Sequence, residues 1–299
     1  MKQRTIKQAV SVKGIGIHSG LITNMKLVPA PENTGIVFVR VDFNSPVAIP
    51  AIRKNAVKGN LNTELSVGSV KVKTVEHLLS ALSGLGIDNL YVELNNEEVP
   101  ILDGSAASYC YLIREAGIQE QKAYKKSIKI TKPVRVGDEN AWAEFIPHNK
   151  FTLDFSIEFD HPVIGNSEFK LDLTNETYLK HVSRARTFGF IKDIDALYAA
   201  NLALGASLDN SIVLDDTRVV NPGELRYSDE FVRHKILDAI GDLYLSGHHY
   251  TGYYRAYKSG HWLNYQLIEK VHQTNSYVIV DHSSEHSHEC STQLLPKFS

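Results

Sequence analysis

The order of the predicted elements most constrains the fold, because one series occurs twice in the 299 residues. Each half begins with strands, which a helix, a strand and a second helix follow, at 74–85, 89–94 and 103–116 and again at 229–246, 250–257 and 261–273. The helices are indicated by apolar residues at helical spacing and the strands by alternation. This order predicts an α+β fold of two similar βα-sandwich domains, each a sheet packed on a helical layer.

The domain boundaries follow from the polar stretch 119–126, which we predict to be the linker. The predicted units are a first domain at 1–121, a second domain at 127–280 and a polar tail at 281–299. An apolar segment rich in Ala and Leu, 194–204, is predicted to form a short helix, which composition alone would assign to the core.

Two helix starts are predicted from their residues. Thr74 is a typical N-cap for the helix 74–85, and Asp103-Gly104-Ser105 is expected to open the helix 103–116.

Composition excludes several classes of protein. The net charge is −2, so the chain is not a strongly basic nucleic-acid binder. No apolar run reaches the roughly 18 residues of a spanning helix, and the first eight residues lack the apolar region of a secretory signal. The two cysteines, Cys110 and Cys290, are too few for a disulfide framework. We therefore expect a reduced, cytoplasmic protein without a transmembrane segment.

The strongest chemical pattern is on the predicted helix 229–246. His234, Asp238 and Asp242 are spaced four residues apart, so they share one stripe of the helix. The first two are suitable ligands for one metal ion, since zinc accepts imidazole nitrogen and carboxylate oxygen together. The alternative is a solvated polar face with a His–Asp pair.

Two further patterns contain histidine. Glu76 and His77 lie off the apolar stripe of their helix, where the alternative is an exposed acid beside a structural histidine. His261 follows Gly260 at a strand-to-helix turn, where the alternative is a cap. A catalytic zinc site needs three protein ligands and one open position, which His77, His234 and Asp238 would provide. Glu76 would then be the general base and His261 the acid.

The chain resembles a known family across nearly its whole length. The similarity rests on ordered blocks at 14–20, 74–78, 81–89, 100–106, 183–190, 229–235 and 256–261. These resemble the zinc-dependent UDP-3-O-acyl-N-acetylglucosamine deacetylases, which carry out the committed step of lipid A synthesis. The resemblance implies a Zn2+-dependent amidase that releases acetate from UDP-3-O-(3-hydroxyacyl)-N-acetylglucosamine, with its active site between the two domains.

The resemblance also implies a role for individual residues. His77, His234 and Asp238 match the zinc ligands, Glu76 the base that activates water, and His261 the acid. Asp242 matches the carboxylate that orients His261, and Thr187 the hydroxyl that donates to the oxyanion. The resemblance further implies a hydrophobic insertion in the second domain that forms a passage for the acyl chain. Residues implied to contact the substrate are Lys235 and Lys258 near the diphosphate, Phe159 near the uracil, and Phe188, Ile194, Ala203, Ser207 and Val213 along this passage.

Other interpretations remain open at this stage. The chain could deacetylate another N-acetyl sugar, or bind a nucleotide sugar or acyl chain without catalysis. We expect a monomer whose partner is the acylated UDP-sugar, without nucleic acid and with at most transient contact with a membrane surface.

The remaining histidines and Cys110 are expected to be largely structural. His248 and His249 are assigned to a turn, Cys110 to the core, and His286, His288 and Cys290 to the tail. His18, in the first glycine-rich block, is equally compatible with a position near the site or away from it.

Overall fold

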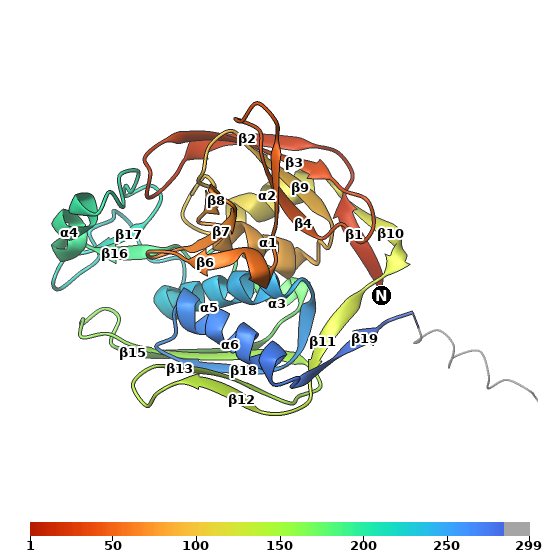
Figure 1. Cartoon of the computed structure of the whole chain (residues 1–299). Helices are drawn as coiled ribbons and strands as arrows, with labels where there is room; N and C mark the ends of the chain where they lie inside the picture. The colour runs from red at the N-terminus through yellow and green to blue at the C-terminus, as the bar shows by residue number, and fades with distance from the viewer. Residues whose placement is uncertain (284–299) are drawn as a thin grey trace, which may run out of the picture.

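The computed structural model describes residues 1–283 and confirms the mixed α+β fold. Figure 1 shows two sheets on the outside of the molecule with the helices of both halves between them. The sequence-predicted repeat is therefore a structural one: each half has a sheet on one side of its helices and the helices of the other half on the other side.

The first half contains a five-stranded sheet in the order β2-β3-β9-β4-β5 and a separate three-stranded sheet. Their bounds are β2 Val10–Ile15, β3 Ile22–Pro29, β4 Ile36–Arg40, β5 Val47–Pro50, β9 Leu90–Leu94, β6 Ala56–Lys58, β7 Thr63–Val67 and β8 Val70–Lys73. Strand β3 alternates exposed and buried residues, so Met25 and Leu27 face the core. The helices are α1 (Glu76–Leu85) and α2 (Ala107–Glu115), and a short 3-10 turn, η1, spans Arg53–Asn55.

The second half is built on a seven-stranded sheet centred on β18, which pairs with β13, β14 and β11. Its strands are β11 Lys126–Ile130, β12 Val134–Gly137, β13 Trp142–Ile146, β14 Phe151–Glu158, β15 Asn166–Asp172, β18 His249–Tyr257 and β19 Tyr277–Asp281. The helical elements are α3 Asn175–His181, α5 Glu230–Leu243, η3 Tyr244–Ser246 and α6 His261–Gln273. Every second residue of β18 is buried, which is expected where helices cover one face.

The two halves meet where α1 crosses α5. All ten residues of α1 are buried, including the charged Glu76. The crossing is close because Gly241 on α5 has no side chain: a Cβ built there would lie 2.0 Å from the carbonyl oxygen of Glu76. Tyr178 of α3 packs against Gly84 of α1 in the same way. Glycines therefore set the distance between the helical layers.

An insertion projects from the second half, as Figure 1 shows around α4. It consists of the parallel strands β16 (Phe188–Phe190) and β17 (Ile212–Leu214), connected through η2 (Ile191–Asp193) and α4 (Ile194–Ala199). The helix predicted at 194–204 is thus shorter. It is not a core helix, because none of the residues of α4 is buried.

Three further predictions need correction. Thr74 is not the N-cap of α1: it adopts the left-handed φ of 58°, and its hydroxyl donates to Glu98 at 2.9 Å instead. The second helix begins at Ala107, because Gly104 needs a positive φ. The predicted linker contains a strand, β10 (Ile118–Tyr124), which pairs with β1 (Lys2–Ile6), so backbone hydrogen bonds hold this stretch.

Candidate active site

The predicted metal ligands meet in the structure. His77 of α1 and His234 and Asp238 of α5 are buried, and one potential ligand atom of each lies within 4.8 Å of the others. Asp238 Oδ1 is 3.5 Å from His77 Nε2 and 3.3 Å from His234 Nε2. Two residues spaced four apart on α5 and one from the first turn of α1 thus converge across the helix crossing.

Hydrogen bonds orient two members of this cluster. The Nδ1–H of His234 donates to the carbonyl of Ala185 at 3.0 Å, which leaves Nε2 facing the cluster as a lone-pair donor. Burial lowers the pKa of His234 to about 4, so its imidazole is neutral at physiological pH. Burial alone would raise the pKa of Asp238, but the nearby positive charge of the Lys235 ammonium, 3.0 Å from Oδ2, helps to hold it well below its ordinary value.

The donor set fits a metal ion. Asp238 Oδ1 and His77 Nδ1 are buried atoms without a hydrogen-bond partner among the described residues. An unpaired buried carboxylate oxygen is costly unless a cation satisfies it. Two imidazoles and one carboxylate form a set typical of a three-ligand zinc site. The alternative of a solvated polar face is wrong, because all three side chains are buried.

Glu76 and His261 lie opposite each other beside this cluster. Glu76 Oε1 is 3.9 Å from His261 Nε2, and the backbone N–H of Thr63 donates to Glu76 Oε2 at 3.0 Å. Burial raises the pKa of Glu76, which is 3% exposed. The earlier alternative of an exposed acid at this position is therefore wrong. The carboxylate can accept a proton more readily than an ordinary glutamate.

The charge of His261 is controlled by Asp242. Burial alone would lower the pKa of His261, but the Asp242 carboxylate at 2.9 Å from Nδ1 and the nearby Glu76 raise it to about 9. Asp242 accepts two more hydrogen bonds, from Asn264 Nδ2 at 2.8 Å and Thr63 Oγ1 at 2.6 Å. The site thus places a buried carboxyl group with a raised pKa next to an imidazole that is protonated at neutral pH.

A cavity of about 940 Å³ extends from these residues into the insertion. One end contains polar side chains, including Glu76, His77, Asp238 and His261. The other end is mostly apolar and is lined by the insertion, with Phe188, Phe190, Ile194, Leu197, Ala200, Ala203 and Val213. Such a cavity can hold a ligand with a polar reacting group and a long apolar chain.

Thr187 lies between the two ends and is placed by the first half. Its N–H donates to the carbonyl of Gly104 at 2.8 Å. Gly104 cannot be replaced freely, since a Cβ there would lie 2.1 Å from the carbonyl oxygen of Asn210. The loop that was predicted to open a helix instead anchors a cavity residue.

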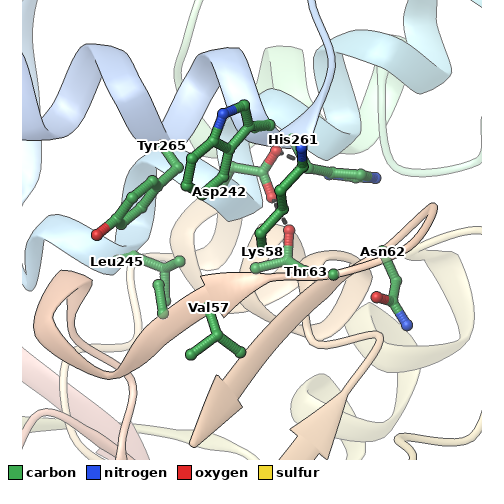
Figure 2. A pocket seen from close by; sticks show the side chains of 11 residues that line it. Val57, Lys58, Asn62, Thr63, Asp242, Leu245, His261 and Tyr265 are labelled. Atoms are coloured by element: carbon green, nitrogen blue, oxygen red, sulfur yellow. Dashed lines mark hydrogen bonds and ion pairs between the residues drawn. The ribbon is translucent and has the colours of Figure 1, made fainter.

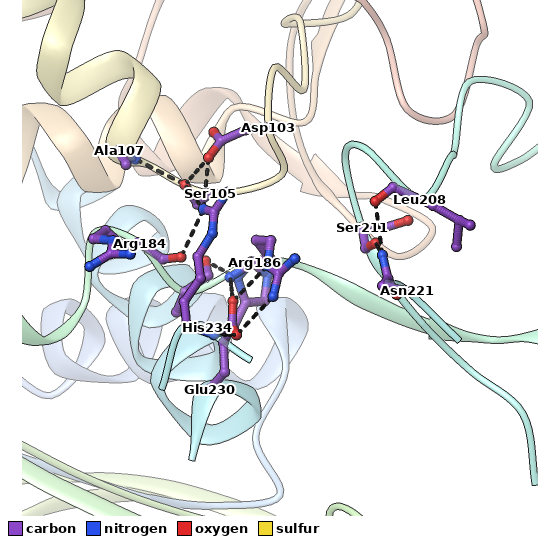
Figure 3. Close-up of polar contacts among 12 residues, drawn as sticks. Asp103, Ser105, Ala107, Arg184, Arg186, Leu208, Ser211, Asn221, Glu230 and His234 are labelled. Atoms are coloured by element: carbon purple, nitrogen blue, oxygen red, sulfur yellow. Dashed lines mark hydrogen bonds and ion pairs between the residues drawn. The ribbon is translucent and has the colours of Figure 1, made fainter. Parts of the chain in front are cut away.

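Ion pairs fix the loop that leads to Thr187, as Figure 3 shows. Glu230, which is fully buried, accepts hydrogen bonds from Arg186 at 2.9 and 3.2 Å. Arg226 donates to Asp103 at 2.8 Å and to the carbonyl of Arg184 at 3.0 Å. Paired and hydrogen-bonded charges of this kind hold a loop in one geometry.

Most predicted substrate residues line the cavity, and three do not. The predicted substrate residues that line it are Phe188, Ile194, Ala203, Val213 and Lys235. Phe159 lies behind Phe188 at a ring distance of 5.7 Å. The hydroxyl of Ser207 accepts a hydrogen bond from the backbone N–H of Asp209 in its own loop. The side chain of Lys258 is exposed beside Glu158. The substrate roles of these three residues remain predictions.

Sequence reasoning missed two residues that hold Asp242. Asn264 is one helical turn after His261 on α6, a spacing that could have indicated it. Thr63 lies 179 residues from Asp242 in the sequence, and no local pattern relates the two. Asn62, next to Thr63, also lines the cavity.

The structure also places the remaining histidines and Cys110. His18 lines the cavity, and its backbone N–H donates to Glu98. His249 packs against Tyr244, and Cys110 is buried, as predicted. His286, His288 and Cys290 lie outside the described residues. Within residues 1–283, no helix has the length and apolar character needed to cross a membrane.

Known proteins similar to this chain agree with the geometry. A family model described as UDP-3-O-acyl N-acetylglycosamine deacetylase matches residues 3–273. The chain is 48% identical to the UDP-3-O-acyl-N-acetylglucosamine deacetylase of Pasteurella multocida, with 99% of both chains covered. It is 52% identical to the protein of the same name from Idiomarina loihiensis, with 91% of this chain and 90% of the relative covered. It is also 52% identical to the one from Hahella chejuensis, with 94% of both chains covered.

The match spans the elements that carry the buried histidine–aspartate cluster, the Glu76–His261 pair and the apolar insertion. Deacetylation of an N-acetyl group is the hydrolysis of an amide. The chain belongs to the UDP-3-O-acyl N-acetylglycosamine deacetylase family and is an amide-hydrolysing enzyme.

Proposed function

We propose that this protein is a zinc-dependent deacetylase that hydrolyses the N-acetyl amide of UDP-3-O-(3-hydroxyacyl)-N-acetylglucosamine. The observation that carries the proposal is one cavity in which a buried His77–His234–Asp238 cluster lies at the end of an apolar passage. The reaction releases acetate and UDP-3-O-acyl-glucosamine, the committed step of lipid A biosynthesis. The names of the relatives support this substrate.

His77, His234 and Asp238 would hold the ion. When bound, zinc supplies a Lewis acid that polarises a carbonyl and lowers the pKa of water to about 7. The neutral imidazole of His234 and the ionised carboxylate of Asp238 suit this role without further proton loss.

Glu76 is proposed as the general base. Its raised pKa lets it take a proton from the attacking water near neutral pH, and its carboxylate is held by the Thr63 N–H. We propose that the hydroxyl of Thr187, which lines the cavity, donates to the oxyanion of the tetrahedral intermediate. When water adds to the amide, Glu76 thus accepts the proton that the water loses, and Thr187 stabilises the negative charge on the carbonyl oxygen.

His261 is proposed as the general acid. With a pKa of about 9 it carries a proton at pH 7 and can deliver it from Nε2 to the departing amine, while Nδ1–H stays bonded to Asp242. The base starts deprotonated and the acid protonated at the same pH, as two-step amide hydrolysis requires.

The apolar end of the cavity is proposed to hold the 3-O-acyl chain. Phe188, Ile194, Ala203 and Val213 offer contacts, and each buried methylene contributes about 0.8 kcal/mol. Lys235 lies near the polar end, where it suits a phosphate. We also propose that Phe159, Ser207 and Lys258, which lie outside the cavity lining, contact the substrate. The protein is proposed to act as a monomer in the cytoplasm.

The experiment that tests this proposal is acetate release by the purified protein, combined with measurement of bound zinc. We expect one zinc ion per chain, loss of activity on chelation and recovery with zinc. We also expect a much higher kcat/KM for the acylated UDP-sugar than for UDP-N-acetylglucosamine.

Two results would contradict the proposal. A protein that binds the acylated nucleotide sugar but releases no acetate with zinc present would be a binding protein. Equal kcat/KM values with and without the acyl chain would mean that the enzyme acts on another N-acetyl sugar and that the passage has no role in recognition.

A further inference from the structure

Thr63, on strand β7, contacts the proposed base Glu76 and Asp242, the hydrogen-bond partner of the proposed acid. Its backbone N–H donates to Glu76 Oε2 at 3.0 Å, and its hydroxyl donates to Asp242 Oδ1 at 2.6 Å. Figure 2 shows Thr63 below Asp242, with the hydrogen bond between them, and His261 on the other side of the carboxylate. One buried residue thus bridges the base on α1 and the partner of the acid on α5.

The backbone of Thr63 is fixed before its side chain makes any contact. Thr63 pairs with Lys58 in the three-stranded sheet, and its carbonyl accepts from the N–H of Val75, the residue before α1. Its side chain is β-branched and buried, so few rotamers are available to it. The hydroxyl therefore has a defined position relative to Glu76.

The hydroxyl has a specific task on Asp242. Oδ2 of this carboxylate accepts from His261 Nδ1 and Asn264 Nδ2. Among the described residues, Thr63 is the one hydrogen-bond donor to Oδ1. Without it, the carboxylate would be held through one oxygen only and could rotate. The plane of Asp242 determines the direction of the His261 ring, and so the direction of Nε2 toward Glu76.

We propose that Thr63 is a positioning residue that sets the geometry between the base Glu76 and the acid His261 through its N–H and its hydroxyl. This inference rests on the proposed function, because it assigns Thr63 to the same amide hydrolysis. Thr63 acts through Glu76 and Asp242 and does not line the cavity that would hold the substrate.

Two substitutions separate the hydroxyl from the rest of the side chain. Thr63→Val keeps the shape, the strand preference and the N–H to Glu76 but removes the hydroxyl. Thr63→Ser keeps the hydroxyl and removes the methyl group. A hydrogen bond to a charged group contributes about 1.5–3 kcal/mol, so we expect Thr63→Val to lower kcat about 10- to 100-fold. Thr63→Ser should remain close to the wild type, and KM and zinc content should change little in both.

A structural role predicts the opposite order. If Thr63 only fills space in the sheet, Thr63→Val is the better-tolerated variant and Thr63→Ser the worse one, in both the melting temperature and kcat. A valine variant at least as active as the serine variant would overturn the proposal.

A spectroscopic measurement keeps the inference testable without turnover. We expect a downfield proton NMR signal from the Nδ1–H of His261, assigned by its loss in His261→Gln. It should be unchanged in Thr63→Ser and shifted or broadened in Thr63→Val. An unchanged signal in the folded valine variant would contradict the proposal. A wild-type protein that shows these signals but releases no acetate would instead contradict the proposed function.

Discussion

The two ends of the large cavity differ in how they are held. At the polar end, the side chains of Glu76, Asp238, Asp242 and His261 are buried or nearly so and are fixed by several hydrogen bonds. At the apolar end, α4 is a six-residue helix with no buried residue. The insertion that forms this end also carries exposed apolar side chains outside the cavity lining, such as Tyr198 and Leu204.

This difference shows which part of the reaction needs precision. The groups that we propose for catalysis must keep their distances within a fraction of an ångström, and Glu76, Asp242 and His261 lie on the helices α1, α5 and α6 in the middle of the molecule. An acyl chain needs only apolar contact, which does not depend on direction. A short projecting unit is sufficient for that purpose and can adapt to the chain it holds.

The largest effect is expected from Glu76→Gln, which removes the base at the polar end and keeps its shape. General base catalysis contributes about 10²- to 10⁴-fold, so kcat should fall by that factor. Zinc content should stay at the wild-type level, since Glu76 is not one of the proposed ligands. The measurements are acetate release and metal analysis. Zinc loss in parallel with activity would mean that Glu76 is a ligand.

A matched pair of glycine substitutions compares the two ends directly. Gly241→Ala places a Cβ 2.0 Å from the Glu76 carbonyl oxygen, and such overpacking costs about 1–3 kcal/mol. Gly189→Ala, in the insertion, meets nothing within 4 Å. We expect the first to lower the unfolding free energy and kcat, although alanine ordinarily favours a helix. Gly189→Ala should change neither the unfolding free energy, measured in denaturant titrations, nor kcat. If Gly241→Ala also left both unchanged, the helix crossing would be able to relax around the added Cβ.

A substitution in the passage should separate binding from chemistry. Val213→Trp fills part of the apolar end, so the acyl chain loses contacts worth about 0.8 kcal/mol per methylene. We expect kcat/KM for the acylated substrate to fall about tenfold for each 1.4 kcal/mol lost, with little change for the substrate without the chain. Val213→Ile is the size control. Equal losses on both substrates would place Val213 in the chemical step.

The smallest change is a shift in the pH profile. His261 has a pKa of about 9, so the rate should fall as the pH rises through that value. In Asp242→Asn the burial of His261 is no longer opposed by the nearest charge, so we expect the alkaline limb to move down by about one pH unit or more. An unmoved limb would show that another group titrates there.

The same shift affects stability. Because the folded-state pKa of His261 lies above its ordinary value of 6.5, its contribution is complete below pH 6.5 and is lost as the pH rises to about 9. The wild type should therefore lose unfolding free energy over this interval, and Asp242→Asn should lose less. Denaturant titrations at pH 6 and pH 9 measure the difference.

Regular spacing made much of the site predictable. The step of four residues between His234 and Asp238 and the position of His77 in its helix indicated the metal cluster before the fold was known. The repeated order of strands and helices indicated a sheet packed on helices in each half, but not that the two helical layers pack against each other. In both cases the information is local and periodic.

The errors arose where long-range contacts override local preference. Thr74 has the side chain of an N-cap, but its hydroxyl donates a hydrogen bond to buried Glu98 and the residue adopts a left-handed φ. Asp103 and Gly104 look like a helix start, yet their loop anchors Thr187 and Arg226. Thr63 had no recognisable pattern, because its partners come from α1 and α5.

The crossing of α1 and α5 has a consequence for the binding of the proposed zinc ion. Since each half contributes ligands to one cluster, neither fragment expressed alone would possess a complete coordination sphere. Metal occupancy then reports on the docking of the halves, and added zinc stabilises the docked arrangement by mass action. Because the three side chains also line the large cavity, a chelator could reach a bound ion without separation of the halves, whereas loss of the α1–α5 contact would dismantle the ligand set itself.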